Sequence, residues 1–575
     1  MQNLLLGDWL MIVIYSLLMV VIGLYCARFA KKGISYFAGG RRVPWWLSGV
    51  SGWMGAFSAY VFVGMASAIY KVGMAPLYHL LYAMSFAWLL GALFWAARWR
   101  RTGIITVPEY MEKRFNLATR QVFAWVVTPF RIADDGVKCY ATAFIIAFVF
   151  GIPAWAGVLG LSLVTIAYTV IGGLWAVMIT DVVQFVILVV VMFVVVPVGL
   201  GKVGWLSGLA AGAPEHFFRV FHDGAAFDGD FTLLFLVAMW LMHPFLYNGS
   251  FTLVQRYTTV PSPADARRSA FLSMALGLVF FPLILAPPMI SRVLYGDSLM
   301  AGTSLMETSY IRLCVDLLPV GMIGVVVVAL MAATMSALSA DYNIYGAVLT
   351  NDLYHRLINP AASQRKLALV GKLCTLIVGG LALVVALSVE KLGGAFKVMM
   401  TILGLIGGPT TIPILLGLWL RRPSPAAAIS ALAAGVGVGA VGKLQFGFNT
   451  AQLVLTNIPV TTAVFLAWGW LWPARGAMKE KVDRFFERLQ SGEALTAERE
   501  EQVADRDREA GREEEQVPSA FKIAGVILGV IGLALGLVGL FASSGGGLGI
   551  NLAVSLVLLL LAGLMIGGGR FVRHG

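Results

Sequence analysis

The stretch "VGMIGVVVVALMAATMSALSADYN" (320–343) decides the fold. It runs from Val320 to Ala340 without a charged residue, which is about the length that a helix needs to cross a bilayer. Because hydrocarbon offers the backbone no hydrogen bonds, we expect this stretch to be an α-helix. The same helix carries Ser336, Ser339 and Asp341. An ionisable residue at membrane depth indicates a functional site.

The whole chain has the composition of a polytopic membrane protein. Of its 575 residues, 59% are hydrophobic and only 13% are charged, and its mean hydropathy is +0.84. Apolar stretches recur from Asp8 almost to the C-terminus, so we predict an all-α membrane protein with about fifteen transmembrane helices. The first, Trp9 to Leu24, is followed by Arg28 and has no small-residue cleavage site. We therefore interpret it as a retained helix and not as a signal peptide.

The formal net charge of +12 could suggest nucleic acid as a partner in a soluble protein. Here the basic residues gather in alternate loops if the N-terminus lies outside, as the positive-inside rule requires. We therefore expect the chain to lie in a lipid bilayer and not to bind nucleic acid. The expected location is the cell or inner membrane, with the C-terminus in the cytoplasm. The loops assigned to the cytoplasm hold, among others, Arg41, Arg42, Arg98, Arg100, Arg101, Arg256, Arg267, Arg268, Arg356, Arg421 and Arg422.

Soluble catalytic patterns are missing from the sequence. There is no phosphate-cradling glycine loop followed by Lys-Ser/Thr and no HExxH, and the six histidines are scattered. The four cysteines lack metal-ligand spacing, so we expect neither a zinc site nor a disulfide framework. We predict that the protein is not an enzyme and has no organic cofactor.

Ionisable residues mark the fourth and sixth apolar segments. "RIADDGVKCY" holds Arg131, Asp134, Asp135 and Lys138, in which three- and four-residue spacings allow pairing on one helix face. These residues can be structural ion pairs or a coupling network, and the sequence favours neither. Asp181 lies in "GGLWAVMITDVVQF"; taken alone, it is typical of an acid near a helix start.

Ser336 and Ser339 lie one helical turn apart among small residues, which is typical of ordinary close helix packing. The alternative is a site for a hard cation, formed by these hydroxyls and by carbonyls of a broken neighbouring helix. The second segment, "LSGVSGWMGAFSAYVFVGMAS", is rich enough in glycine to provide that break. The two features together favour a sodium site more than either alone.

At this point the sequence resembles the sodium:solute symporter family, which includes sugar, proline, pantothenate and sialic acid transporters. The resemblance runs over roughly residues 8 to 475. Its two most specific segments are "GGLWAVMITDVVQF" (172–185) and "SALSADYNIYGAVLTNDLY" (336–354). The other segments that match are "RRVPWWLSGVSGWMGAFSA" (41–59), "ITVPEYMEKRFN" (105–116) and "VQRYTTVPSPADARRSA" (254–270). It implies a LeuT-like core of two inverted five-helix repeats.

The expected organisation follows from that core. It has an N-terminal extra helix and cytoplasmic loop (1–45), a first repeat (46–200), an extracytoplasmic loop (201–230), a second repeat (231–420), two peripheral helices (421–473), a charged cytoplasmic linker (474–520) and a C-terminal two-helix hairpin (521–575). The linker has too few apolar residues to bury a core. The hairpin has no intramembrane charge, so we expect it to be structural.

The resemblance also implies cation ligands. A sodium site would use carbonyls of Met54, Phe57 and Ala333 and hydroxyls at Ser336 and Ala337, and a further site would use Asp181, Ser339 and Ala340. The sequence departs from this pattern because both alanines lack the hydroxyl. Sodium could take an oxygen from water or Asp341, Asp341 and Asp181 could take protons, or Lys138 could serve as a fixed ammonium.

The expected solute site lies between the two helix breaks. The resemblance places Tyr60 and Val61 after the first break and Tyr247, Asn248, Ser250 and Phe251 at the second. We predict a secondary active transporter that imports a small organic solute, a sugar, amino acid or organic acid, by sodium symport with alternating access. The alternatives are a proton-coupled carrier or uncoupled facilitator, and a membrane sensor that signals through the linker.

Overall fold

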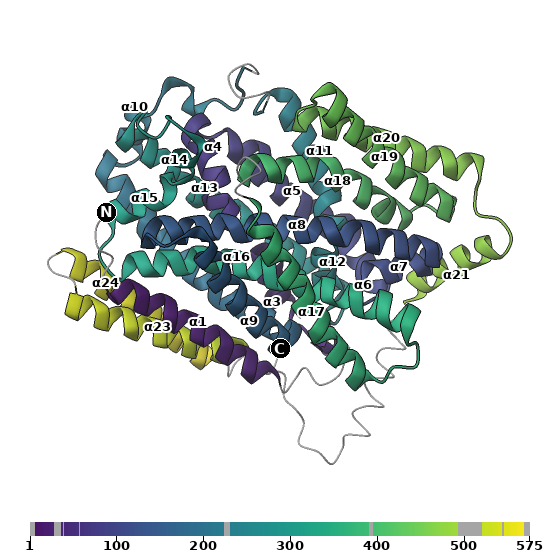
Figure 1. Ribbon diagram of the computed structural model, residues 1–575, viewed down its shortest axis with the longest axis horizontal. Coiled ribbons are helices and arrows are strands. Elements are labelled where there is room, and N and C mark those ends of the chain that lie inside the picture. Colours follow the sequence, from purple (N-terminus) through teal and green to yellow (C-terminus); the bar gives the residue numbers. More distant parts are fainter. Residues whose placement is uncertain are drawn as a thin grey trace, which may run out of the picture.

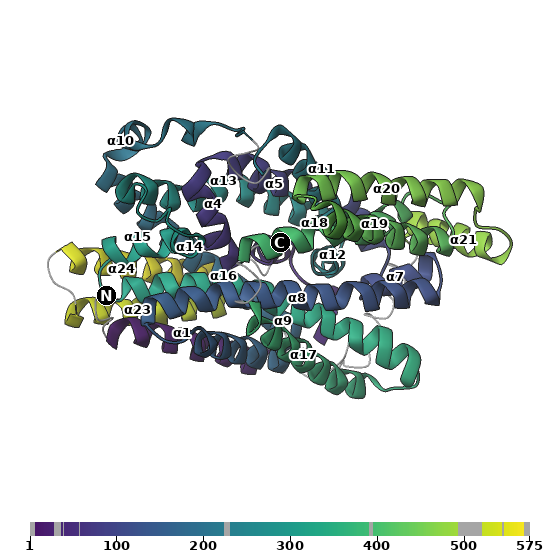
Figure 2. The same ribbon diagram turned by 45° about the horizontal axis from the view of Figure 1, so that its top comes forward.

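The computed structural model describes residues 6–27, 36–37, 39–56, 58–223, 230–389, 395–492, 520–542 and 546–568. These residues form helices and include no strand, which confirms the all-α fold. Most helices run side by side in one bundle (Figures 1 and 2). Phe57 and residues 493–519 of the expected linker lie outside the described residues.

The helical elements follow one another in chain order. The first set is α1 (Leu6–Cys26), η2 (Gly39–Arg41), α3 (Trp45–Met54), η3 (Ala59–Phe62), α4 (Gly64–Val72), η4 (Leu77–Leu81), α5 (Tyr82–Leu90), η5 (Gly91–Trp95), α6 (Ala96–Arg101), α7 (Val107–Arg114), α8 (Leu117–Phe150), α9 (Ala154–Val203), α10 (Trp205–Gly212) and η6 (Glu215–Phe218). The second set is α11 (Leu233–Gly249), α12 (Phe251–Thr258), α13 (Pro263–Tyr295), α14 (Thr303–Glu307), α15 (Ser309–Leu317), α16 (Met322–Ala347), η8 (Val348–Ile358), α17 (Gln364–Ala386) and α18 (Ala395–Gly417). The last set is α19 (Pro425–Phe446), α20 (Thr450–Leu471), α21 (Ala477–Ser491), α23 (Ala520–Ala542) and α24 (Gly546–Gly568).

Helix α16 is the centre of the bundle. Every one of its residues is buried, and it packs against α1, α8, α9 and α17. Gly324 lets α1 approach closely, since a Cβ added there would lie 2.6 Å from the backbone oxygen of Asp8. The polar side chains of α16 therefore face protein and not lipid, as an intramembrane site requires.

Eleven described helices are long and apolar enough to cross a membrane, or 13 if each bent helix pair counts as one span. Helix α8 is not among them because its charged residues leave no sufficiently apolar window in its 34 residues. Helix α9 has 50 residues with a kink at Gly173, whose φ is 58°, and it joins two segments that the sequence predicts separately. Length and composition thus do not confirm about fifteen transmembrane helices. The difference arises because α8 is not counted and α9 is counted as one helix.

The first and last helices both contact the turn that precedes α16. The Asp8 carboxylate accepts hydrogen bonds from the backbone N–H groups of Gly321 (2.8 Å) and Gly324 (2.7 Å), as a capping side chain does at a helix start. On the other side, the amide of Asn551 in α24 donates to the carbonyl of Val320 at 2.8 Å. Helices α1 and α23 lie along one edge of the bundle (Figures 1 and 2).

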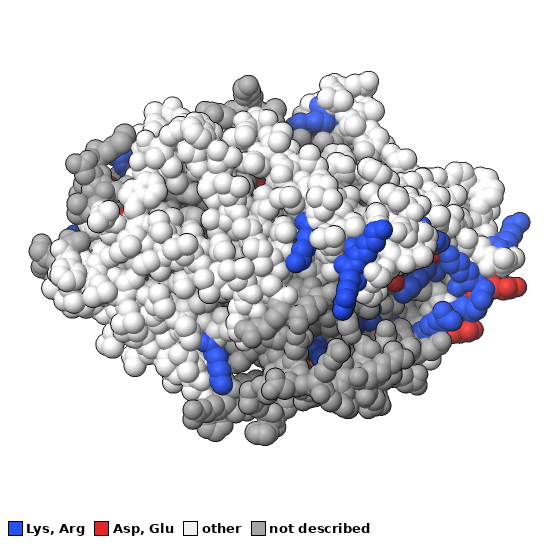
Figure 3. Space-filling model, turned by 60° about the horizontal axis from the view of Figure 1, so that its bottom comes forward, with Lys and Arg blue, Asp and Glu red and all other residues white. Residues whose placement is uncertain are grey.

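Basic side chains gather at one end of the molecular face seen in Figure 3, and much of the remaining surface in that view is uncharged. At the end of the bundle that carries α7, α21 packs on this short helix, and Lys481 donates to the backbone oxygen of Glu112 at 2.7 Å. The Glu112 carboxylate also accepts hydrogen bonds from Arg356 (2.6 Å) and Arg120 (2.7 Å). The bond from Arg356 is the main cause that lowers the pKa of Glu112 to about 2.

Replacement of Asp8 by leucine should destabilise the protein, because two buried N–H groups lose their acceptor. The expected cost is about 1–3 kcal/mol in the free energy of unfolding. Thermal unfolding of the purified protein in detergent measures it. Asp8→Asn, which keeps an acceptor oxygen, should cost less; equal losses in the two variants would contradict the capping role.

Replacement of Glu112 by glutamine should remove a stabilisation that depends on pH. Because folding lowers the pKa of Glu112 from 4.5 to about 2, its stabilisation is complete above about pH 4.5 and is lost as the pH falls through 2. The parent protein should unfold at a higher temperature than Glu112→Gln by a constant margin from pH 5 to 8, and the margin should shrink below pH 4.5. A margin that grows on acidification would contradict this sign.

Candidate functional site

Two helix breaks face the middle of the bundle. The first separates α3 from η3 and α4, and the second separates α11 from α12 with a bend of 54°. A break frees backbone groups that need partners at this depth. At the first break, the N–H of Ala59 donates to the Thr334 hydroxyl of α16 at 2.7 Å. Tyr247 donates to the carbonyl of Ala56 at 3.2 Å, and thus connects the two breaks.

The second break has a clear local cause. Pro244 lies inside α11, and Ser250 is extended, with φ −64° and ψ 133°. Gly249 permits the close approach of α18, since a Cβ added there would lie 2.6 Å from the Cβ of Thr411. The chain then starts again as α12 at Phe251. The sequence "HPFLYNGSF" therefore encodes the break through one proline and one glycine.

A cavity of about 110 Å³ lies between the breaks. Four of the residues predicted to bind solute line it, namely Tyr60, Val61, Tyr247 and Ser250. Its other walls are mainly apolar, with Met65 and Met84 among them, and His243 stacks on Tyr247 with ring centroids 5.7 Å apart. A partly open space whose walls combine apolar side chains with a few polar and charged groups is typical of a small-molecule site.

Two other predicted solute residues have different surroundings. Asn248 is fully buried, and its amide donates to the backbone oxygens of Ala87 (2.8 Å) and Pro244 (2.9 Å). It is not among the residues that line the cavity, because these bonds hold it against α5 and its own helix. Phe251 lines a smaller adjoining pocket of about 40 Å³ and stacks on Tyr345.

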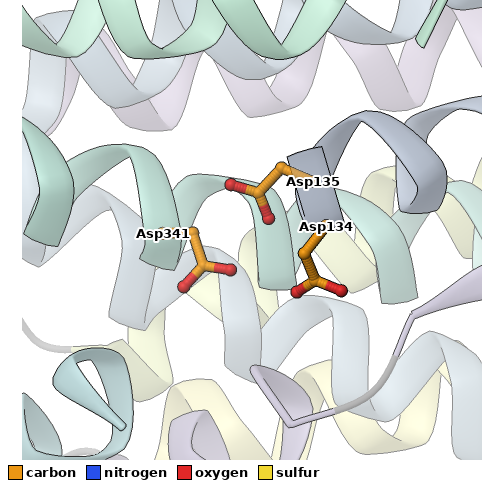
Figure 4. A group of neighbouring side chains, drawn as sticks. All are labelled: Asp134, Asp135 and Asp341. Carbon is orange, nitrogen blue, oxygen red and sulfur yellow. The ribbon is translucent and has the colours of Figure 1, made fainter. Parts of the chain in front are cut away.

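The charged residues of α8 form one network beside the cavity. Arg131 pairs with Asp134 at 3.1 Å, and Lys138 pairs with Asp134 at 2.8 Å, as the helical spacing predicts. Lys138 also contacts Asp135 (3.1 Å) and, across to α16, Asp341 (3.0 Å). Figure 4 shows the three carboxylates of this network grouped between α8 and α16.

Asp181 marks a second polar centre, on α9. Ser51 of α3 donates to its carboxylate, and Ser336 of α16 lies beside it. The guanidinium of Arg256 in α12 is 3.8 Å from the same carboxylate. Among the described residues, Asp181 Oδ1 and Ser336 Oγ are buried and make no hydrogen bond of normal geometry, although the Ser336 hydroxyl lies within reach of the Asp181 carboxylate. Buried oxygens of this kind usually have a ligand or a proton donor.

The other expected cation ligands lie around the same helices. Met54 ends α3, and Ala333 and Ala337 are buried in α16. The hydroxyl of Ser339 donates to the backbone oxygen of Ser336 at 3.1 Å, which uses its proton and leaves its oxygen able to accept or to bind a cation. Phe57, the remaining expected carbonyl ligand, lies outside the described residues.

Sequence reasoning missed three polar residues of this region. Arg256, which the charge pattern assigns to a loop, is only 2% exposed and faces Asp181. Thr252 donates to Asp341, and Thr334 accepts from Ala59. The four-residue spacing of Thr252 and Arg256 just after the break is the signal that could have identified both, since it puts them on one face of α12.

Comparisons with known proteins agree with this geometry. The sequence model of the sodium:solute symporter family matches residues 36–435. Sodium/glucose cotransporter 4 of Danio rerio is 26% identical over 490 residues, which cover 79% of this chain and 74% of that protein. The sodium/glucose cotransporter of Vibrio parahaemolyticus is 26% identical over 462 residues, which cover 75% of this chain and 83% of that protein.

A solved structure shows the same fold. The substrate-bound, outward-open state of a sodium-coupled sialic acid symporter superposes with a TM-score of 0.71 at 22% sequence identity. The superposition covers 82% of this chain and 100% of that one. The likeness confirms the expected LeuT-like arrangement of the helices.

The different surroundings of Asn248 and Ser250 give a paired prediction. Asn248→Leu should lower the free energy of unfolding by about 1–3 kcal/mol, because the two buried hydrogen bonds that its amide donates and the one that it accepts from Tyr257 are lost. The folded fraction should bind solute normally. Ser250→Ala should lower the free energy of unfolding less, since it removes only the hydrogen bond that the hydroxyl accepts from Arg131 (3.3 Å), and should alter the half-saturating solute concentration severalfold. Unfolding curves and uptake kinetics measure both; an affinity change confined to Asn248→Leu would contradict the assignment.

Proposed function

We propose that this chain, which belongs to the sodium:solute symporter family, imports a small organic solute by alternating access. Its family makes it a sodium-coupled solute symporter and not an enzyme. The main support for the proposal is the cavity that lies between the two facing helix breaks. Such breaks provide backbone groups for a solute and its ion near the middle of the membrane.

We propose that the solute binds in this cavity against Tyr60, Val61, Tyr247 and Ser250. Its volume of about 110 Å³ is smaller than the 150 Å³ or so of an engineered cavity that holds benzene, so a larger solute needs a more open conformation. The relatives are named as carriers of glucose and sialic acid. Sugars, amino acids and organic acids are thus the classes to screen.

Sodium is the co-transported ion, and we propose that it binds at Asp181, Ser336 and Ser339. The support is the pair of buried oxygens that make no hydrogen bond of normal geometry, Asp181 Oδ1 and Ser336 Oγ, since sodium prefers oxygen ligands. Backbone oxygens of Met54, Phe57 and Ala333 complete the proposed set. Ala337 and Ala340 contribute no side-chain oxygen, and water takes their place, because Lys138 and Thr252 already donate to the two oxygens of Asp341.

We also propose an orientation and a domain organisation. Exposed basic residues at the end of the bundle that carries α7 and α21 favour a cytoplasmic location for that end, in a cell or inner membrane, with the N-terminus outside. The bent pairs α3–α4 and α11–α12 begin the two inverted repeats, over residues 46–200 and 231–420. Helices α1, α23 and α24 form a structural edge outside them.

Uptake into proteoliposomes tests the proposal. Pools of sugars, amino acids and organic acids are offered under a sodium gradient, a proton gradient or neither, and uptake should require sodium. Ser336→Ala should raise the half-saturating sodium concentration about tenfold, which corresponds to about 1.4 kcal/mol for one lost ligand.

Ser555→Ala is the matched control, since this buried serine bonds only within the α23–α24 hairpin. It should leave the sodium dependence unchanged. Uptake driven by protons alone, or without any gradient, would refute sodium coupling. Solute binding without uptake of any pool would favour a sensor.

A further inference from the structure

Lys138 is the centre of a buried group of carboxylates. Its ammonium lies 2.8 Å from Asp134, 3.1 Å from Asp135 and 3.0 Å from Asp341. The ammonium, which has three N–H donors, donates to Asp135 and Asp341 and forms an ion pair with Asp134, so carboxylates surround it. All four residues are at most 9% exposed. Three carboxylates thus surround the Lys138 ammonium as oxygen ligands surround a bound cation, except that this cation is part of the chain.

The group around Lys138 has the features of a cation site. Carboxylate oxygens of Asp134, Asp135 and Asp341 lie within 4.8 Å of one another (Figure 4). Two further oxygens, Asp134 Oδ1 and Asp135 Oδ2, are buried without a hydrogen-bond partner among the described residues. Without the lysine, Arg131 would be the one basic residue in ion-pair contact with these three acids among the described residues, and it contacts Asp134 alone. Such an excess of charge is costly at membrane depth.

This group is separate from the proposed sodium ligands on the same helix. Asp341 follows Ser336 by five residues, which is about 7.5 Å along a helix axis. It also connects three elements, because Lys138 belongs to α8, Asp341 to α16, and the Thr252 that donates to Asp341 to α12. Lys138, Asp134 and Asp341 line the solute cavity. The positive charge of Lys138 therefore lies at the cavity wall and interacts with carboxylates of the unbroken helices α8 and α16, and through Asp341 the group reaches α12 of a broken pair.

We propose that Lys138 is a resident cation: its tethered ammonium occupies a monovalent-cation site formed by Asp134, Asp135 and Asp341, and removal of the lysine opens that site to a free cation. A free ion at this position could leave with the solute, whereas the tethered one remains in every conformation. Lys138 is thus a positioning residue that fixes one unit of charge at the cavity. The inference rests on the proposed function only in assigning the cavity to a solute.

The test measures cation binding and not transport, so its failure is distinct from a failure of the proposed function. The purified Lys138→Met variant is unfolded by heat in choline chloride, then with ammonium, methylammonium or sodium at constant ionic strength. A cation that fits should raise the midpoint of unfolding by about 2 °C at a concentration about 100 times its Kd. The parent protein and Lys443→Met, a variant at a lysine that does not line the cavity, should show no rise in ammonium or methylammonium and a smaller rise in sodium, which they bind only at the proposed sodium ligands.

The result that overturns the proposal is a midpoint of Lys138→Met that rises no more than that of the parent in ammonium, methylammonium and sodium. If Lys138→Met does not fold in any salt, Lys138→Met/Asp135→Asn decides the matter, because it removes one positive and one negative charge together. Folding of the double variant supports a charge held by Lys138. Its failure to fold would assign the lysine to packing alone and refute a resident cation.

Discussion

The constraint on which this structure depends is that hydrocarbon satisfies neither a charge nor a free backbone group. Helix α16 meets it by being buried along its whole length, with protein on every side. It can then carry Ser336, Ser339 and Asp341 at a depth where a lipid-facing helix could not. The same constraint explains the Asp8 carboxylate at the start of α16, because the first N–H groups of a buried helix need acceptors.

The helix breaks create the same need at the cavity, and polar side chains of neighbouring helices meet it. Thr334 accepts from the N–H of Ala59, and Tyr247 donates to the carbonyl of Ala56. The breaks are therefore stabilised by α16 and by each other. The groups that bond to the backbone at the first break belong to other helices. If the broken pairs move, these hydrogen bonds must therefore be broken and replaced by others. This is the physical link between the solute cavity and a change of conformation.

The sequence predicts most of this fold, because apolar segments of spanning length must be helices in lipid. It also predicts the pairing of Arg131, Asp134 and Lys138, since helical spacing alone places them on one face. It does not predict that Lys138 reaches Asp341, a contact between residues 203 positions apart. Nor does it separate Asn248 from Ser250, which are two positions apart, because the break between α11 and α12 turns one toward α5 and the other toward the cavity.

Arg256 shows how one such unpredicted contact bears on coupling. Its charge pattern is that of a cytoplasmic loop, yet it is buried on α12 and lies 3.8 Å from Asp181 on α9. It partly balances that carboxylate in the conformation described. A sodium ion at Asp181 would compete with Arg256 for the same negative charge and weaken the attraction between α9 and the broken pair α11–α12. Occupancy of the ion site and the position of α12 are then linked by electrostatics, even though Ala337 and Ala340 provide no hydroxyl. This coupling requires only that the sodium ion and the Arg256 guanidinium compete for the Asp181 carboxylate.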